Sequence, residues 1–270
     1  FTGTIEGLSV ASQKKVVVLV NKPESYPTTA ITKYSDFTNI ANMVSLDSQA
    51  PSNSKTNGFF MSGESEPVQL NALQVVNVKI QVKRMVAKIM LGSLKIDSEA
   101  VNLLPDFKLT RVSIQKARDN SLALNELATE GFNYVSGIVP NDANAEKIYL
   151  HEAYELPENY TINQTLEPKK YFYVFPNDAS EQATMMTIAG TYRNKEIYYT
   201  FKINDKASDT NGNSTDGNNI ERNKIYTLHV TLKKLGNGGE DPNIPNENAD
   251  LSVTVEVADW DGELEQEVEW

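Results

Sequence analysis

The two histidines are the residues best suited to acid–base catalysis or metal binding near neutral pH. His151 and His229 lie far apart in the sequence, and neither has a second His or a Cys at metal-site spacing. The sequence also lacks the motifs of serine hydrolases, phosphate-binding loops and zinc proteases. Carboxylates are abundant, but no pair is singled out as the acid and nucleophile of a glycosidase. We therefore expect no catalytic residue, no cofactor and no enzymatic activity.

The loop at 205–219 is the best candidate for a metal site. Asp209 and the asparagines at the next two alternate positions have the spacing with which a calcium-binding loop begins. Such a loop requires Gly at its sixth position and Glu at its twelfth, where this sequence has Ser214 and Ile220. A solvated hairpin loop is the better interpretation, so the sequence predicts no metal ligand and leaves calcium in this loop open.

Charge and composition exclude several classes of function. The 25 Lys and Arg against 36 Asp and Glu give a net charge of −11. This balance disfavours nucleic acid and anionic membranes, because both bind clustered basic residues. The absence of Cys excludes disulfides and thiol chemistry within the chain, and no apolar run approaches the ~20 residues of a membrane span. The 40 % hydrophobic content indicates a globular protein.

The elements that position the remaining residues are mainly short β-strands. Apolar residues alternate with polar ones in runs that turn residues separate. Strands are expected at 16–20, 76–91, 108–116, 131–139, 171–175, 185–192, 196–202 and 224–233. The run at 76–91 changes its apolar face near 83–85, which predicts a bulge or break because a period of two cannot otherwise switch face.

One short helix is expected among these strands. Phe37, Ile40, Ala41 and Val44 have helical spacing after a capping Ser or Asp, whereas 45–57 has the composition of a loop. Many short strands between turn clusters are typical of β-sandwiches, so the fold class is all-β with a short helix.

Turn-rich and glycine-rich stretches divide the chain. The cluster at 140–144 predicts a boundary between an N-terminal sandwich domain at 1–145 and a C-terminal sandwich domain at 146–235. The Gly- and Pro-containing stretch at 236–248 is predicted to be a flexible linker, and 249–270 a separate strand segment.

The C-terminal segment has the pattern of a strand that needs a partner sheet. Four aliphatic residues alternate with mostly polar ones: Leu251, Val253, Val255 and Val257. Both tryptophans, Trp260 and Trp270, follow them, and alternate positions from 263 to 269 are Glu. This strand can fold back on its own domain, or complete the sheet of a neighbour. The spacing alone leaves both open.

Four segments together resemble the fimbrillins of Bacteroidales. Residues 82–89 are similar to an R-x-V-A-K-I strand of that family, and 171–177 to its aromatic Y-V-F-P-x-N strand. Residues 221–232 resemble an R-N-x-x-Y-x-L-x-V-T segment, and 251–260 a closing L-x-V-T-V-x-V-x-x-W strand. Each motif is weak alone, but their common order over most of the chain indicates the FimA-type and minor-fimbria-type major subunits of type V pili.

This resemblance implies two tandem transthyretin-like β-sandwich domains and a structural role. It implies export through the outer membrane as a lipoprotein precursor, to a fimbrium at the cell surface. An arginine-specific protease would remove an N-terminal strand and open a groove, which the C-terminal segment of another copy or a related pilus subunit fills. The contact residues that carry over are Leu251, Val253, Val255, Val257, Trp260, Leu264, Val268 and Trp270.

Some features depart from the family pattern and keep other roles open. No lipid-bearing Cys is present, and no arginine precedes Arg84, so we expect that Phe1 lies close to a trimmed start. A tip or anchor subunit that binds host proteins or glycans is one alternative. A surface glycan-binding lipoprotein of sandwich fold is another, with Tyr26, Tyr154 and Tyr160 as candidate contacts.

Overall fold

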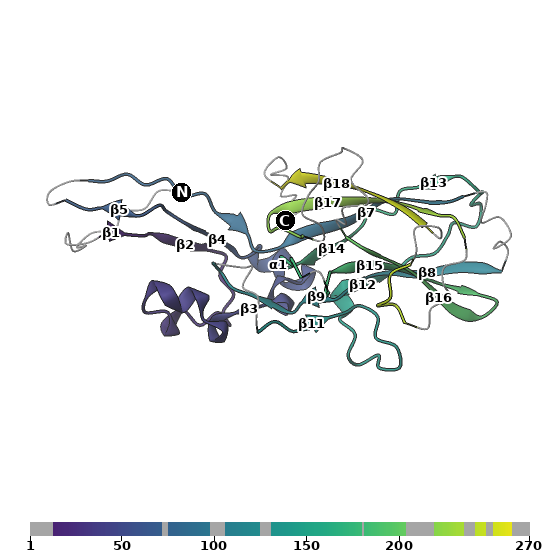
Figure 1. Cartoon of the computed structure of the whole chain (residues 1–270), viewed down its shortest axis with the longest axis horizontal. Coiled ribbons are helices and arrows are strands. Elements are labelled where there is room, and N and C mark those ends of the chain that lie inside the picture. Colours follow the sequence, from purple (N-terminus) through teal and green to yellow (C-terminus); the bar gives the residue numbers. More distant parts are fainter. Residues whose placement is uncertain are drawn as a thin grey trace.

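The computed structural model shows a β-sandwich from which a thinner arm of strands projects (Figure 1). It describes residues 13–71, 75–97, 106–124, 131–179, 181–203, 219–234, 241–246 and 251–260. The fold class is all-β, as predicted, with a short α-helix α1 at Pro51–Asn57.

Two sheets face each other in the sandwich. The first has the order β13-β7-β17-β18, with β14 also paired to β7, and the second has the order β12-β8-β15-β16. Their strands are β7 Ala87–Ile96, β8 Phe107–Gln115, β12 His151–Ala153, β13 Thr165–Leu166, β14 Lys170–Val174, β15 Met185–Tyr192, β16 Lys195–Lys202, β17 Lys224–Leu232 and β18 Leu251–Asp259. Only β7 and β17 run parallel among these pairs.

The core between the sheets follows from alternation along each strand. In β7 and β17 every second side chain is buried over most of the strand, including Ile89, Leu91 and Leu228, while the intervening residues are only partly covered. The pairing between β17 and β7 shifts by one residue between Leu228 and His229, and this shift keeps the buried residues of the two strands opposite each other. The 3₁₀ turn η6, Ile148–Leu150, precedes β12.

The arm is a narrow layer that lies beyond the end of the sandwich (Figure 1). It contains β1 Gln13–Lys14, β2 Val17–Val20, β4 Met61–Glu64, β5 Val68–Gln69 and β6 Lys83–Arg84, paired as β2-β4-β6 and β1-β5. Between arm and sandwich lie β3 Val44–Ser45, β9 Ala117–Arg118, β10 Asn120–Ser121 and β11 Tyr134–Val135. The 3₁₀ turns η1 Thr28–Ala30, η2 Tyr34–Thr38, η3 Ile40–Asn42 and η4 Leu46–Gln49 lie between β2 and α1 in the sequence.

Most strand predictions are confirmed within one or two residues. These are the predictions for β2, β8, β14, β15, β16, β17 and β18. The break expected near 83–85 is present, because β6 ends at Arg84 and β7 begins at Ala87. By contrast, 75–82 does not form a strand, and the strand expected at 131–139 is limited to β11.

The helix prediction was wrong in position. Residues 36–42 lie mostly in η2 and η3, and Val44 begins β3, while the α-helix lies at 51–57, where a loop was expected. Pro51 at the first helical position and Gly58 with a positive φ after the last turn are ordinary helix boundary signals.

Strand pairing does not follow the predicted boundary at 145. Strands β7 and β8 precede it, yet both are hydrogen-bonded to strands that follow it. Part of the predicted linker is also anchored. Asn246 donates its backbone N–H to the Thr200 carbonyl at 2.8 Å, and the Pro242 carbonyl accepts from the Thr187 and Thr200 hydroxyls.

Candidate subunit-contact site

Strand β18 lies at the edge of its sheet and is paired with β17 of the same chain along its whole length. The antiparallel register runs from Leu232 opposite Leu251 to Lys224 opposite Asp259. Lys224 donates to the Asp259 carboxylate, and this hydrogen bond holds the pKa of Asp259 below its ordinary value. In this structure the predicted donor strand is therefore docked on its own sandwich.

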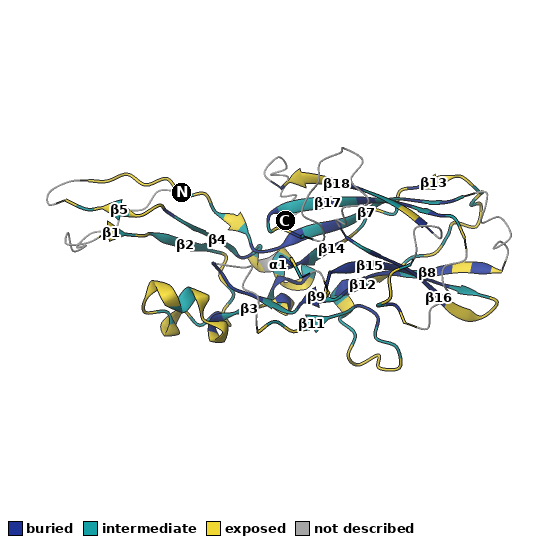
Figure 2. Ribbon diagram, in the orientation of Figure 1, coloured by how far each residue is buried: buried dark blue, intermediate teal, exposed yellow. Residues whose placement is uncertain are grey.

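The predicted contact residues of β18 differ in how deeply they are buried. Leu251 and Val255 lie in the core, and Val253 packs against it. Val257 lies on the same face of the strand but is 48 % exposed. The apolar face of β18 is thus covered over most of the strand and exposed near its C-terminal end (Figure 2).

Trp260 is enclosed by three side chains that come from different parts of the chain. Its ring stacks on Tyr173 with centroids 5.7 Å apart and 9° between the planes, and it meets the edge of Phe59 at 5.4 Å. The Arg84 guanidinium carbon lies 4.6 Å from the ring centroid. We call Phe59, Arg84 and Tyr173 the Trp260 cage. Only 8 % of Trp260 is exposed.

Backbone contacts fix the position of the same tryptophan. Trp260 donates its N–H to the Asn223 carbonyl at 3.0 Å, and its own carbonyl accepts from Arg84 at 3.2 Å. The Asn223 side-chain oxygen also accepts from Arg84, from both its backbone N–H and its guanidinium. Burial raises the pKa of Tyr173 to about 12, so this ring is neutral at ordinary pH.

Arg222 joins the sandwich to the arm beside this cage. Its guanidinium donates to the Arg84 carbonyl at 2.9 Å, to the Ser62 carbonyl at 3.2 Å and to the Lys83 carbonyl. These acceptors lie on β4 and β6. Arg222 and Asn223, which belong to the fimbrillin-like segment 221–232, therefore connect the start of β17 to the base of the arm.

The arm has an uncovered apolar face. All four residues of β2 are only half-buried, and Val75, Val76 and Val78 are exposed on the segment 75–82 (Figure 2). This segment passes close to β4, since a Cβ added to Gly63 would lie 2.2 Å from the Gln81 carbonyl oxygen. The alternation that predicted a strand here is present, but no described strand pairs with it.

A hollow of about 540 Å³ lies beside this part of the arm, with Leu124 and Ser62 in its wall. Glu64 in the wall accepts from Lys15 at 2.8 Å and from the Tyr34 hydroxyl at 2.6 Å. Burial opposes the ionised form, but these hydrogen bonds outweigh it and keep the pKa of Glu64 below its ordinary value.

The two histidines lie in separate networks. His229 Nδ1 and Ser93 Oγ are 2.8 Å apart, and its Nε2 is 3.6 Å from Glu256. Ser93 lies in the middle of β7 on the outer side of the sheet, and none of the described contacts supplies an oxyanion-binding pair of donors beside it.

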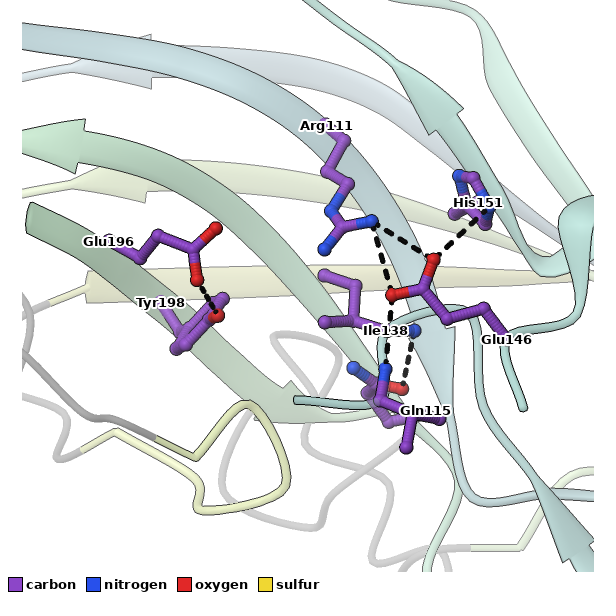
Figure 3. A network of polar contacts seen from close by, with 8 residues as sticks. Arg111, Gln115, Ile138, Glu146, His151, Glu196 and Tyr198 are labelled. Atoms are coloured by element: carbon purple, nitrogen blue, oxygen red, sulfur yellow. Dashed lines mark hydrogen bonds and ion pairs between the residues drawn. The ribbon is translucent and has the colours of Figure 1, made fainter. Parts of the chain in front are cut away.

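His151 belongs to the network drawn in Figure 3. Glu146 accepts from Arg111 through both carboxylate oxygens at 3.3 Å, and lies 3.8 Å from His151. Burial, and secondarily Arg111, lower the pKa of His151, although Glu146 acts in the opposite direction. These contacts tie the loop before β12 onto β8, and we assign the network a structural role.

The tyrosines predicted for glycan binding are not an exposed aromatic surface. Tyr26 is buried at 4 % exposure, and Tyr154 and Tyr160 pack against the core. The Tyr160 hydroxyl accepts from the Ile96 backbone N–H. The positions Leu264, Val268 and Trp270, and most of the possible calcium loop at 205–219, lie outside the described residues. Within the described part, His and acidic side chains form no cluster of metal-binding type.

Comparisons with known proteins agree with the motifs. Residues 190–266 match the family model described as major fimbrial subunit protein type IV, Fimbrillin, C-terminal, a region that includes β16, β17 and β18. The resemblance to the fimbrillins is thereby confirmed over this C-terminal region. No curated protein matches the chain.

Solved structures show the same fold. A proposed cell adhesion protein of Bacteroides eggerthii is 23 % identical, with a TM-score of 0.68 over 96 % of this chain and 81 % of its own. A fimbrillin (FimA) of Porphyromonas gingivalis is 15 % identical, with a TM-score of 0.59 over 93 % and 81 % of the two chains. Among the described helices, none is long and apolar enough to cross a membrane.

Proposed function

We propose that this protein is a stalk subunit of a bacterial surface fimbria. It polymerises when residues 249–270 of one copy add a strand to the arm of the next copy. The family match supports a fimbrial subunit, and the single observation that carries the assembly mechanism is the exposed, unpaired segment 75–82 on the arm. As the resemblance implies, export as a lipoprotein precursor and trimming by an arginine-specific protease belong to the same proposal.

The donor and the acceptor have matching patterns. Strand β18 alternates aliphatic and mostly polar residues, and so does 75–82, with Val76, Val78 and Ile80 on one face. Added strands of this kind gain backbone hydrogen bonds along the open edge and apolar contacts at alternate positions. A structure with an unpaired, alternating edge therefore favours completion by another strand over a fixed monomer.

Charge distribution supports the same pairing. Positions 261–270 contain one Asp and four Glu and no basic residue. The arm has basic residues on β1, after it, and on 75–84: Lys14, Lys15, Lys79, Lys83 and Arg84. Opposite charges would guide the donor to this surface and weaken the encounter at high salt.

The energetic scale fits a polymer contact. Burial of one aliphatic side chain contributes ~1.5–3 kcal/mol, so four alternate positions contribute roughly 6–12 kcal/mol before the ordering cost of ~1–2 kcal/mol per residue. When β18 leaves β17, strand pairing and burial of the same kind in the neighbouring subunit replace those of its own sandwich. The free energy of moving β18 from its own sandwich to a neighbouring subunit can therefore be close to zero. Distal residues such as Leu264 and Trp270 would then add contacts that the monomer lacks.

The test combines two complementary variants. Deletion of 261–270 keeps β18 but shortens the donor, and Val78→Asp places a charge on the acceptor edge. Light scattering of the full chain at rising concentration should show long species, which neither variant forms alone. A mixture of the two should stop at dimers, because one variant supplies only a donor and the other only an acceptor. Long species from either variant alone would contradict the proposal.

A further inference from the structure

The Trp260 cage couples the end of β18 to both parts of the molecule. Phe59 precedes β4 and Arg84 ends β6 at the base of the arm, whereas Tyr173 lies in β14 of the sandwich. Trp260 contacts all three side chains and closes the docked strand. Trp260 follows the last residue of an edge strand, and its ring belongs to the main cluster of buried hydrophobic side chains.

The neighbouring part of β18 is held weakly in comparison. Val257 and Ala258 are exposed, and Glu256 and Asp259 have solvated carboxylates. An exposed ion pair such as Lys224–Asp259 contributes little on its own. Apart from its backbone pairing with β17, the docked end of β18 therefore depends mainly on the buried aromatic and cation–π contacts of one residue, Trp260.

We propose that Trp260 is a latch that holds β18 on its own sandwich and so sets the rate at which the donor is released. This inference rests on the proposed strand donation and adds its regulation. When Trp260 leaves the cage, the C-terminal half of β18 loses its only deeply buried side chain beyond Val255 among the described residues. Fraying then proceeds from Asp259 towards Leu251.

Release of the donor strand from the cage would also change contacts at the base of the arm. Arg84 belongs to β6 and donates to the Trp260 carbonyl and to Asn223. Departure of Trp260 removes one of these acceptors and the aromatic ring beside the guanidinium. The contacts at the base of the acceptor arm thus depend on whether the donor strand of the same subunit is docked or released. This links donation and acceptance within one subunit.

The test uses a reporter that the sequence already provides. The chain has two tryptophans, so Trp270→Phe leaves Trp260 as the sole indole. In the monomer its emission should be blue-shifted and protected from acrylamide quenching. Hydrogen exchange of the β18 amides is measured in parallel in the full chain. Both readouts concern the monomer and do not require assembly.

Four variants, one of them a control, then separate a latch from a core residue. Trp260→Ala and Tyr173→Leu should raise exchange of β18 amides and speed the onset of assembly at least about tenfold, which corresponds to about 1.4 kcal/mol. Tyr171→Leu is the matched control, because its ring pairs with Tyr173 rather than with Trp260. Trp260→Phe should lie between the parent chain and Trp260→Ala.

Any other result contradicts the proposal that Trp260 is a latch. If Trp260→Ala leaves β18 exchange unchanged, or accelerates it no more than Tyr171→Leu does, Trp260 does not hold the strand. If exchange rises throughout both sheets, Trp260 is a core residue of the whole fold. If the parent chain never assembles, the proposed function fails instead, and the exchange result still decides whether Trp260 holds β18.

Discussion

Two edges of this molecule have similar sequences and different surroundings. At β18 the alternating aliphatic residues are paired with β17 and closed by Trp260, whereas at 75–82 a similar alternation is exposed and unpaired. Alternation therefore predicts that a segment is able to join a sheet, but not that its own chain supplies the neighbour. In the proposed assembly this difference is functional, since one edge would donate and the other would accept.

The largest effect is expected where the arm joins the sandwich. Arg222→Ala should lower the free energy of unfolding by at least about 3 kcal/mol, because several carbonyl acceptors at the base of the arm lose their donor. Urea unfolding measures this change. Arg193→Ala removes an exposed ion pair with Asp106 and should cost less than about 1 kcal/mol. Equal losses would show that Arg222 does not join the two regions.

An intermediate effect distinguishes covered from uncovered positions of β18. Val255→Ala should destabilise the monomer by about 1.5–2 kcal/mol, since it removes two buried methyl groups. Val257→Ala, at the exposed position of the same face, should change it by less than about 0.5 kcal/mol. Thermal unfolding of both variants checks this, and similar shifts would mean that β18 is covered evenly.

A small stability effect with a large assembly effect is expected on the arm. Val78→Asp should alter the free energy of unfolding by less than about 0.5 kcal/mol, because the side chain is 39 % exposed. The same substitution should abolish growth in light scattering. Lys202→Asp, on the edge strand β16 of the sandwich, is the charge control and should assemble normally. Assembly of Val78→Asp at the parent rate would remove the arm from the mechanism.

The smallest effect concerns pH at the end of β18. The pKa of Asp259 is lowered in the folded state by Lys224, so this contact contributes fully above the ordinary value of 3.8. The contribution is lost as the pH falls below 3.8 through the lower folded pKa. The protection of the amides at the end of β18, corrected for intrinsic exchange, should therefore fall as the pH is lowered from 5 to 3 in the parent chain. Asp259→Asn should already show the lower protection at pH 5 and a smaller further loss at pH 3.

The sequence predicted the strands of the sandwich well, because β15, β16 and β17 combine alternation with clear turn residues on both sides. It could not predict the sheet order, in which β7 pairs with β17 from the far end of the chain. The region 34–57 was misassigned because helical spacing of four apolar residues does not distinguish 3₁₀ turns from an α-helix. Trp260 was predicted as a contact residue, but its cage comes from three distant segments that no local pattern connects.

A reversible lock on β18 tests the central claim most directly. Thr227 and Glu256 lie opposite each other on the outer face, and the chain has no cysteine, so Thr227→Cys with Glu256→Cys introduces a single disulfide. We predict that the oxidised chain remains monomeric in light scattering, and that reduction restores growth to the rate of the parent chain. Equal growth before and after reduction would contradict donation of β18, and would leave only residues beyond Trp260 as the donor.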